Sequence, residues 1–66
     1  DGLDVIKKVI YKSTSILKRK GMLALEIGNR QYIKVLKILK SNNFRKVLLV
    51  KDYQDNVRCI ISVLEN

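Results

Sequence analysis

The chain has 66 residues, 47% of them hydrophobic, and its 14 Lys and Arg against 6 Asp and Glu give a formal net charge of +8. A chain of this length forms one small domain with a modest core, and its hydrophobic content argues against intrinsic disorder. It contains no His and one Cys, which excludes a His-based catalytic triad, a metal cluster and an internal disulfide. No apolar run approaches about 18 residues and no signal-peptide pattern is present, so we expect a soluble cytoplasmic protein with no membrane partner.

The positive charge follows two amphipathic segments of the chain. Lysines recur along both at helical spacing, as they do on the solvent face of an amphipathic helix. The aromatic residues are scattered and form no platform on which bases could stack: Tyr11, Tyr32, Phe44 and Tyr53. We therefore expect only weak, non-specific binding of nucleic acid at low salt. A small basic module that binds RNA remains an alternative.

The first segment, residues 3–19, is predicted to be a helix. Asp1 or Asp4 can favour its start, and the basic residues 18–20 complement the dipole at its carboxyl end. Gly21 can supply the left-handed conformation that commonly ends a helix. The positions of the predicted buried face follow the three-and-four spacing of a helix: Leu3, Ile6, Val9, Ile10, Ser13, Ile16 and Leu17.

Residues 22–27 predict a buried parallel strand that ends at a carboxylate, Glu26, and is followed by Gly28. In open α/β sheets, ligands bind outside the carboxyl ends of the strands. Glu26 and Gly28 therefore mark a candidate binding edge, where a carboxylate could orient a substrate amide. Alternatively, Glu26 binds backbone N–H groups at the start of the following helix, where negative charge is favoured. The sequence favours neither role of Glu26 over the other.

A second helix is predicted over residues 30–41. Asn29 is a plausible N-cap, and the run Ser41-Asn42-Asn43 closes the helix because Asn tolerates a positive φ better than most residues. The predicted buried face of this helix comprises Tyr32, Val35, Leu36 and Leu39.

Two β-rich runs, residues 45–53 and 57–64, flank the polar triplet 54–56 and predict a hairpin with a three-residue loop. Cys59 lies inside the last strand and is predicted to be a small buried hydrophobe. No linker or repeat divides the chain, so residues 1–66 form a single α/β unit with the order α-β-α-β-β.

The hairpin predicts an ion pair. If Tyr53 pairs with Val57, Asp52 stands directly opposite Arg58. Such a cross-strand pair contributes about 0.2–1 kcal/mol and helps to fix the register. We interpret Asp52 and Arg58 as a structural pair, with a binding role as the alternative.

Three segments resemble, in their order and spacing, the carboxy-terminal part of the HemK-type protein-glutamine methyltransferases: Asp1-Gly2-Leu3, LEIG at 25–28 followed by Gln31, and KDYQDNVR at 51–58. The resemblance implies a Rossmann-like class I methyltransferase domain of which the chain is the carboxy-terminal portion. It also implies S-adenosylmethionine as the cofactor of the parent enzyme, and methyl transfer to the glutamine side-chain amide of the GGQ motif in peptide chain release factors.

The same resemblance limits which residues can be assigned. The family's glycine-rich cofactor loop and its NPPY motif lie upstream of this sequence, so no cofactor-binding or catalytic residue is assigned and the chain alone is expected to be inactive. Glu26 and Gly28 match the strand end beside the substrate pocket, and Asp52 and Arg58 match the closing hairpin. Asn43 stands where a glycine is more usual in the family. The first residue is Asp, which fits a fragment or a processed product.

In the methyltransferase arrangement, strand 22–27 would pair with strand 57–64 on one side and with a strand from the upstream half on the other. Without that partner, a long apolar edge is exposed, which proteins normally avoid. The isolated chain is therefore expected to be marginally stable or to associate with itself through the edge of strand 22–27. A self-associating interaction domain that uses this edge is the third possible function.

Overall fold

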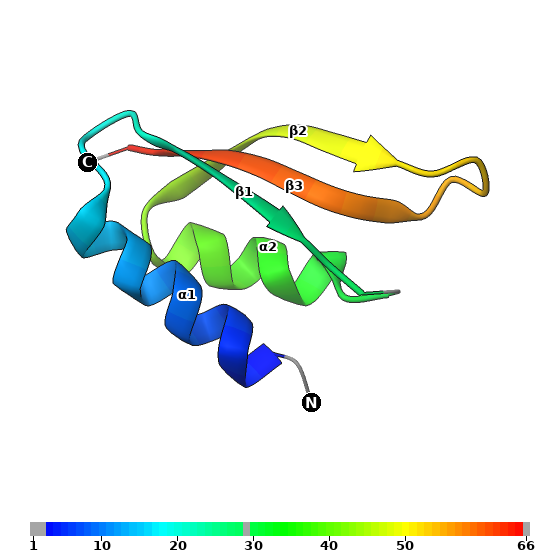
Figure 1. Ribbon diagram of the computed structural model, residues 1–66, viewed down its shortest axis with the longest axis horizontal. Helices are drawn as coiled ribbons and strands as arrows, with labels where there is room; N and C mark the ends of the chain where they lie inside the picture. The colour runs from blue at the N-terminus through cyan, green and yellow to red at the C-terminus, as the bar shows by residue number, and fades with distance from the viewer. Residues whose placement is uncertain (1–2, 29, 66) are drawn as a thin grey trace.

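The computed structural model describes residues 3–28 and 30–65. Two helices lie on one face of a three-stranded sheet (Figure 1). The α-β-α-β-β order predicted from the sequence is confirmed. The elements are helix α1 (Leu3–Ile16), strand β1 (Met22–Glu26), helix α2 (Tyr32–Ser41), strand β2 (Phe44–Lys51) and strand β3 (Val57–Leu64).

The sheet has the strand order β1-β3-β2, so the last strand lies in the middle. The predicted pairing of β1 with β3 is confirmed, with Met22 opposite Val63 and Glu26 opposite Cys59. The predicted parallel strand is not found, because both strand pairings within the described residues are antiparallel. The tight turn between β2 and β3 forces an antiparallel pair, and β1 meets β3 in the same sense. A parallel neighbour of β1 would have to come from its free side.

The core lies between the helices and one face of the sheet. Because side chains alternate along a strand, Leu25 of β1 is buried while its neighbours Ala24 and Glu26 are exposed. The prediction of a buried strand is thus correct for one face only, since the helices cover one face. The buried apolar residues come from every element and from the residue after β1: Ile10, Leu25, Ile27, Val35, Leu39, Phe44, Val57, Ile60 and Leu64.

Helix α1 ends at Ile16, three residues before the predicted end at residue 19. The hydroxyl groups of three consecutive residues near this end donate hydrogen bonds to backbone carbonyls one turn back, which slightly destabilises or bends a helix. These bonds run from Ser13 to Val9, from Thr14 to Tyr11 and from Ser15 to Lys12. The basic residues 18–20 consequently lie beyond the last helical turn.

The predicted left-handed conformation falls on Lys20, with φ of 67°, and not on Gly21. Gly21 is needed for a different reason, because a Cβ there would lie 2.8 Å from the Lys18 carbonyl oxygen. The turn is anchored to the end of β3, since the Lys20 N–H donates to the Leu64 carbonyl and the Leu64 N–H donates to the Gly21 carbonyl.

Helix α2 ends as predicted, with Asn43 in the left-handed conformation at φ of 68°. The Asn43 carbonyl accepts the backbone N–H of Glu65 at 2.8 Å, which ties this turn to the chain beyond β3. Asn, like glycine, adopts this left-handed backbone more readily than most residues. The predicted caps at Asp1 and Asn29 lie outside the described residues.

The hairpin has a longer loop than predicted. Strand β2 ends at Lys51, which pairs with Val57, so Tyr53 has no strand partner among the described residues. The Asp52 N–H donates to the Asn56 carbonyl at 2.9 Å and closes the loop. The register between β2 and β3 shifts twice, at 46–48 and at 50–51. Bulges of this kind add a residue to one strand and shift the alternation of its side chains between the two faces.

Candidate functional site

The carboxyl end of β1 lies beside the base of the β2–β3 hairpin (Figure 1). The backbone N–H of Ile27, just after β1, donates to the Arg58 carbonyl at 2.9 Å. The strand-end residues Glu26 and Gly28 therefore lie at the same end of the sheet as the hairpin that carries Asp52 and Arg58.

Gly28 forms a tight turn with Gln31, the residue that precedes α2. The Gly28 N–H donates to Oε1 of Gln31 at 2.8 Å, and the Gln31 N–H donates to the Gly28 carbonyl at 3.3 Å. A Cβ at Gly28 would lie 2.9 Å from that same Oε1. Glycine thus permits the close approach of the Gln31 side chain, whose flexible end would have to shift to make room for a Cβ here. The sequence pattern marked Gln31 only by its spacing from the strand end and indicated no role for it.

The carboxylate of Glu26 does not cap α2. Leu25 and Ile27 point toward the helices and are buried, so the exposed side chain of Glu26 lies on the opposite face of the sheet. The start of α2 has no side-chain cap hydrogen bond, and the side chain of Gln31 accepts the N–H of Gly28, which lies before the helix. Within residues 3–28 and 30–65 the Glu26 carboxylate makes no hydrogen bond or ion pair. It remains an unused acceptor at the end of β1.

Asp52 organises the hairpin loop through both of its carboxylate oxygens. Oδ1 accepts the N–H groups of Gln54 and Asn56 at 2.9 and 3.0 Å, and Oδ2 accepts Nε of Arg58 at 2.8 Å. The Asn56 N–H, then the Arg58 guanidinium and the Gln54 N–H, outweigh the opposing effect of burial and hold the pKa of Asp52 below its ordinary value of 3.8.

The predicted contact between Asp52 and Arg58 is therefore present, but it does not form across two paired strands. Asp52 lies in the loop and not opposite Arg58 in a ladder, since β2 ends at Lys51. Its oxygens are all engaged by the loop and by Arg58, which leaves little capacity for a ligand. The geometry favours the structural role over the binding role.

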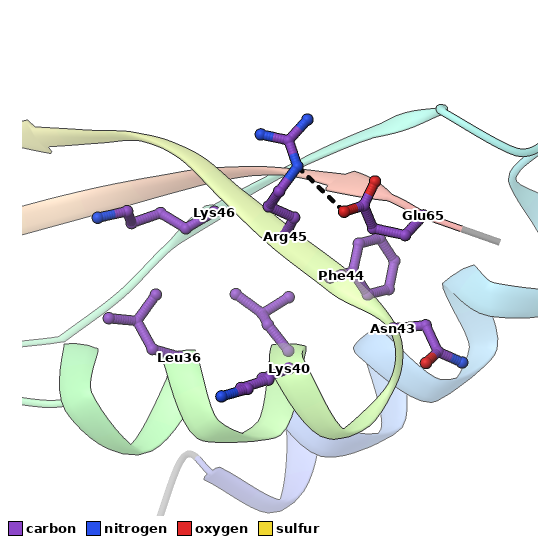
Figure 2. Close-up of a pocket in the computed structure, with 8 residues that line it drawn as sticks. Leu36, Lys40, Asn43, Phe44, Arg45, Lys46 and Glu65 are labelled. Carbon is purple, nitrogen blue, oxygen red and sulfur yellow. Dashed lines mark hydrogen bonds and ion pairs between the residues drawn. The ribbon is translucent and has the colours of Figure 1, made fainter.

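A pocket of about 470 Å³ lies between α2 and the start of β2 (Figure 2). It is at the other end of the sheet from Glu26, because Phe44 pairs with Leu64 whereas Glu26 pairs with Cys59. Its apolar lining includes Leu36, Leu39 and Phe44. The sequence did not indicate this pocket, since it is formed by the junction of a helix with a strand.

Other site types have little support among the described residues. These residues hold no group of three or more His, Cys, Asp or Glu side chains suited to a metal ion. None of the helices described is both long and apolar enough to cross a bilayer. Cys59 is a free thiol and is half-buried, not fully buried as predicted, because its side of the sheet carries no helix.

The chain matches no family model and no solved structure. It is similar to curated proteins named release factor glutamine methyltransferase. The protein from Fusobacterium nucleatum subsp. nucleatum is 45% identical over 94% of this chain, and the alignment spans 18% of that protein. The proteins from Clostridium botulinum and Clostridium acetobutylicum are 38% and 32% identical over 91% and 96% of this chain, and the alignments span 21% and 22% of them.

The three alignments cover nearly the whole chain, and the three relatives have the same name. That name agrees with the family that the DGL, LEIG and KDYQDNVR segments indicated. The chain spans only about a fifth of the length of these relatives. The resemblance of this chain to one part of the HemK-type protein-glutamine methyltransferases is therefore confirmed.

Proposed function

We propose that the chain is the carboxy-terminal segment of a release factor glutamine methyltransferase and has no catalytic activity alone. The observation that carries this proposal is the 45% identity over 94% of the chain to a protein of that name. The parent enzyme would use S-adenosylmethionine and would methylate the glutamine amide of the GGQ motif in release factors. We also keep the cytoplasmic location expected from the sequence as a prediction.

The two edges of the sheet support an upstream partner for β1. The outer edge, β2, carries Arg45 and Lys46 and is interrupted by register shifts. Charged side chains and bulges are typical of edges that stay free. The opposite edge, residues 22–25 of β1, carries no charge and pairs with β3 without a shift. This asymmetry favours a further strand on the free side of β1.

The uncovered face of the sheet supports the same conclusion. Met22, Leu48 and Val50 are 60%, 51% and 42% exposed, and they stand opposite half-buried apolar or small residues of β3. An apolar sheet face of this kind is normally covered by other parts of a protein. The upstream half of the parent enzyme is the cover that we propose.

Glu26 and Gly28 are proposed to form part of the edge of the substrate pocket in that parent enzyme. The carboxylate of Glu26 is an unused acceptor at the end of a strand, and it would orient the substrate by accepting an amide N–H. Gly28 would keep the following turn tight through its contact with Gln31. The cofactor would supply the methyl group, and residues of the upstream half would hold it.

The first test is the size of the native polypeptide, measured with an antibody raised against residues 29–66. We expect a band several times larger than this 7.7 kDa chain, because the relatives are about five times longer. The purified larger protein should then transfer a methyl group from S-adenosylmethionine to a release factor. A band at the size of the chain itself would overturn the proposal, and RNA binding or self-association would become the functions to test.

A further inference from the structure

The pocket between α2 and β2 combines an apolar floor with unpaired positive charge. Leu36, Leu39 and Phe44 provide the floor. Lys40 and Lys46 also line the pocket, and neither forms an ion pair within residues 3–28 and 30–65. Figure 2 shows these two lysines extending on either side of Leu36.

The third cation of the pocket is already neutralised. Nε of Arg45 binds Oε1 of Glu65 at 3.1 Å, and Figure 2 shows that this pair lies at the Phe44 end, away from Leu36. The unpaired charge is thus confined to the end of the pocket that Lys40 and Lys46 flank. A ligand that fits this arrangement places an apolar group over Leu36 and Leu39 and negative charges on either side.

We propose that this pocket binds an acidic segment of a partner protein, which inserts an apolar side chain between carboxylates. The charges are complementary, and the half-buried side chain of Leu36 offers an apolar contact that a side chain of the ligand can cover. The volume of about 470 Å³ lies within the range of ligand pockets in proteins. RNA fits less well, because the one aromatic side chain of the lining, Phe44, is 4% exposed and cannot serve as a stacking surface for bases.

The pocket lies away from the surfaces that the proposed upstream half would cover. It opens beside β2, at the sheet edge opposite to β1, and at the far end of the strands from Glu26. This binding site is therefore independent of the proposed methyltransferase role, and its test does not use methyl transfer as the readout.

The test measures the binding of a short rhodamine-labelled peptide that alternates Glu and Leu, by fluorescence anisotropy, to the longest natural polypeptide that carries these residues. We expect saturable binding that weakens at high salt. The double variant Lys40→Gln/Lys46→Gln should bind the peptide about fivefold more weakly, since it removes two exposed charge contacts. A peptide with Ser in place of Leu should also bind more weakly, because it has nothing to place on the apolar floor.

The matched control is Lys34→Gln/Lys37→Gln, which removes the same amount of charge from exposed positions of α2 outside the pocket. This variant should retain the binding of the unaltered protein. Equal losses in the two double variants would show a general effect of charge and would overturn the proposal. Equal binding of the Ser and Leu peptides, or no binding of either, would also overturn it. Far-UV circular dichroism of each variant confirms that the fold is retained.

Discussion

Asp52 shows how a single side chain can replace regular strand pairing. Its carboxylate accepts two backbone N–H groups of the loop and the guanidinium of Arg58, so the chain reverses without a ladder at residues 52–56. The Asp and Arg types in the sequence predicted this contact. The register did not follow from the sequence, because the same two residues can meet across a ladder or through a loop.

Replacement of Asp52 by Asn should therefore change how stability depends on pH. The pKa of Asp52 is lowered in the folded chain, so its stabilisation is fully present above the ordinary pKa of 3.8 and is lost as the pH falls through the lowered value. Asp52→Asn should lower the urea midpoint near neutral pH and have little effect at a pH well below 3.8.

Asp55→Asn is the control for this variant, because Asp55 is a carboxylate of the same loop whose pair with Lys51 is more exposed. Its urea midpoint should change less near neutral pH. Equal effects of the two substitutions would contradict the role assigned to Asp52.

Asn43 gives a second prediction at the scale of a residue. Its φ of 68° costs little for glycine and about 1–2 kcal/mol for most other residues. Asn43→Gly should leave the free energy of unfolding unchanged or raise it slightly, and Asn43→Ala should lower it by about 1 kcal/mol. Urea denaturation measures both values, and a less stable glycine variant would show that the Asn43 side chain itself is required.

At the scale of elements, apolar periodicity predicted the two helices of the described residues, and a buried apolar run and two β-rich runs predicted the three strands. The ends were less predictable. Helix α1 stops at Ile16, just after three residues whose hydroxyl groups bind the preceding turn, and β2 stops early because Asp52 closes the loop. These contacts depend on side-chain rotamers, which an apolar pattern does not encode.

The candidate site shows the same limit. Glu26 and Gly28 were found from their place at a strand end, but the partner of Gly28 was not, because Gln31 acts through a side chain that folds back on the turn. The pocket of Figure 2 was also missed, because its lining residues come together only when α2 packs against β2.

The junction of β1 and α2 can be tested with a double-mutant cycle. Gln31→Ala removes the acceptor of the Gly28 N–H and should cost about 0.5–1.5 kcal/mol. Gly28→Ala should also be destabilising, because the new methyl group would lie 2.9 Å from Oε1 of Gln31. The double variant should be more stable than the sum of the two effects predicts, because the clash disappears with the Gln31 side chain. Additive effects would show that Gly28 is required by its backbone alone.

At the scale of the whole molecule, the sheet has one protected edge and one unprotected edge, and a helical layer on one face only. The free edge of β1 was predicted from the strand pairing expected in the family that the sequence resembles. The apolar outer face of the sheet was not predicted from the sequence. Only the strand register shows that Met22, Leu48 and Val50 lie on the same side.

Because the two edges differ, one substitution in β1 should have different effects in the isolated chain and in the larger parent polypeptide. Ala24 is exposed on the uncovered face of β1. In the isolated chain, Ala24→Lys should reduce self-association in sedimentation experiments, because a charge on an edge strand discourages pairing. In the larger parent polypeptide, the same substitution should lower the melting temperature, because a lysine would be buried against the upstream half without a partner. Tyr11→Lys, at a position of α1 that is 73% exposed, is the control and should have little effect in either setting. If the isolated chain is instead a monomer at every concentration, with a sharp unfolding transition at high temperature, then β1 needs no partner, and the chain is an independent fold.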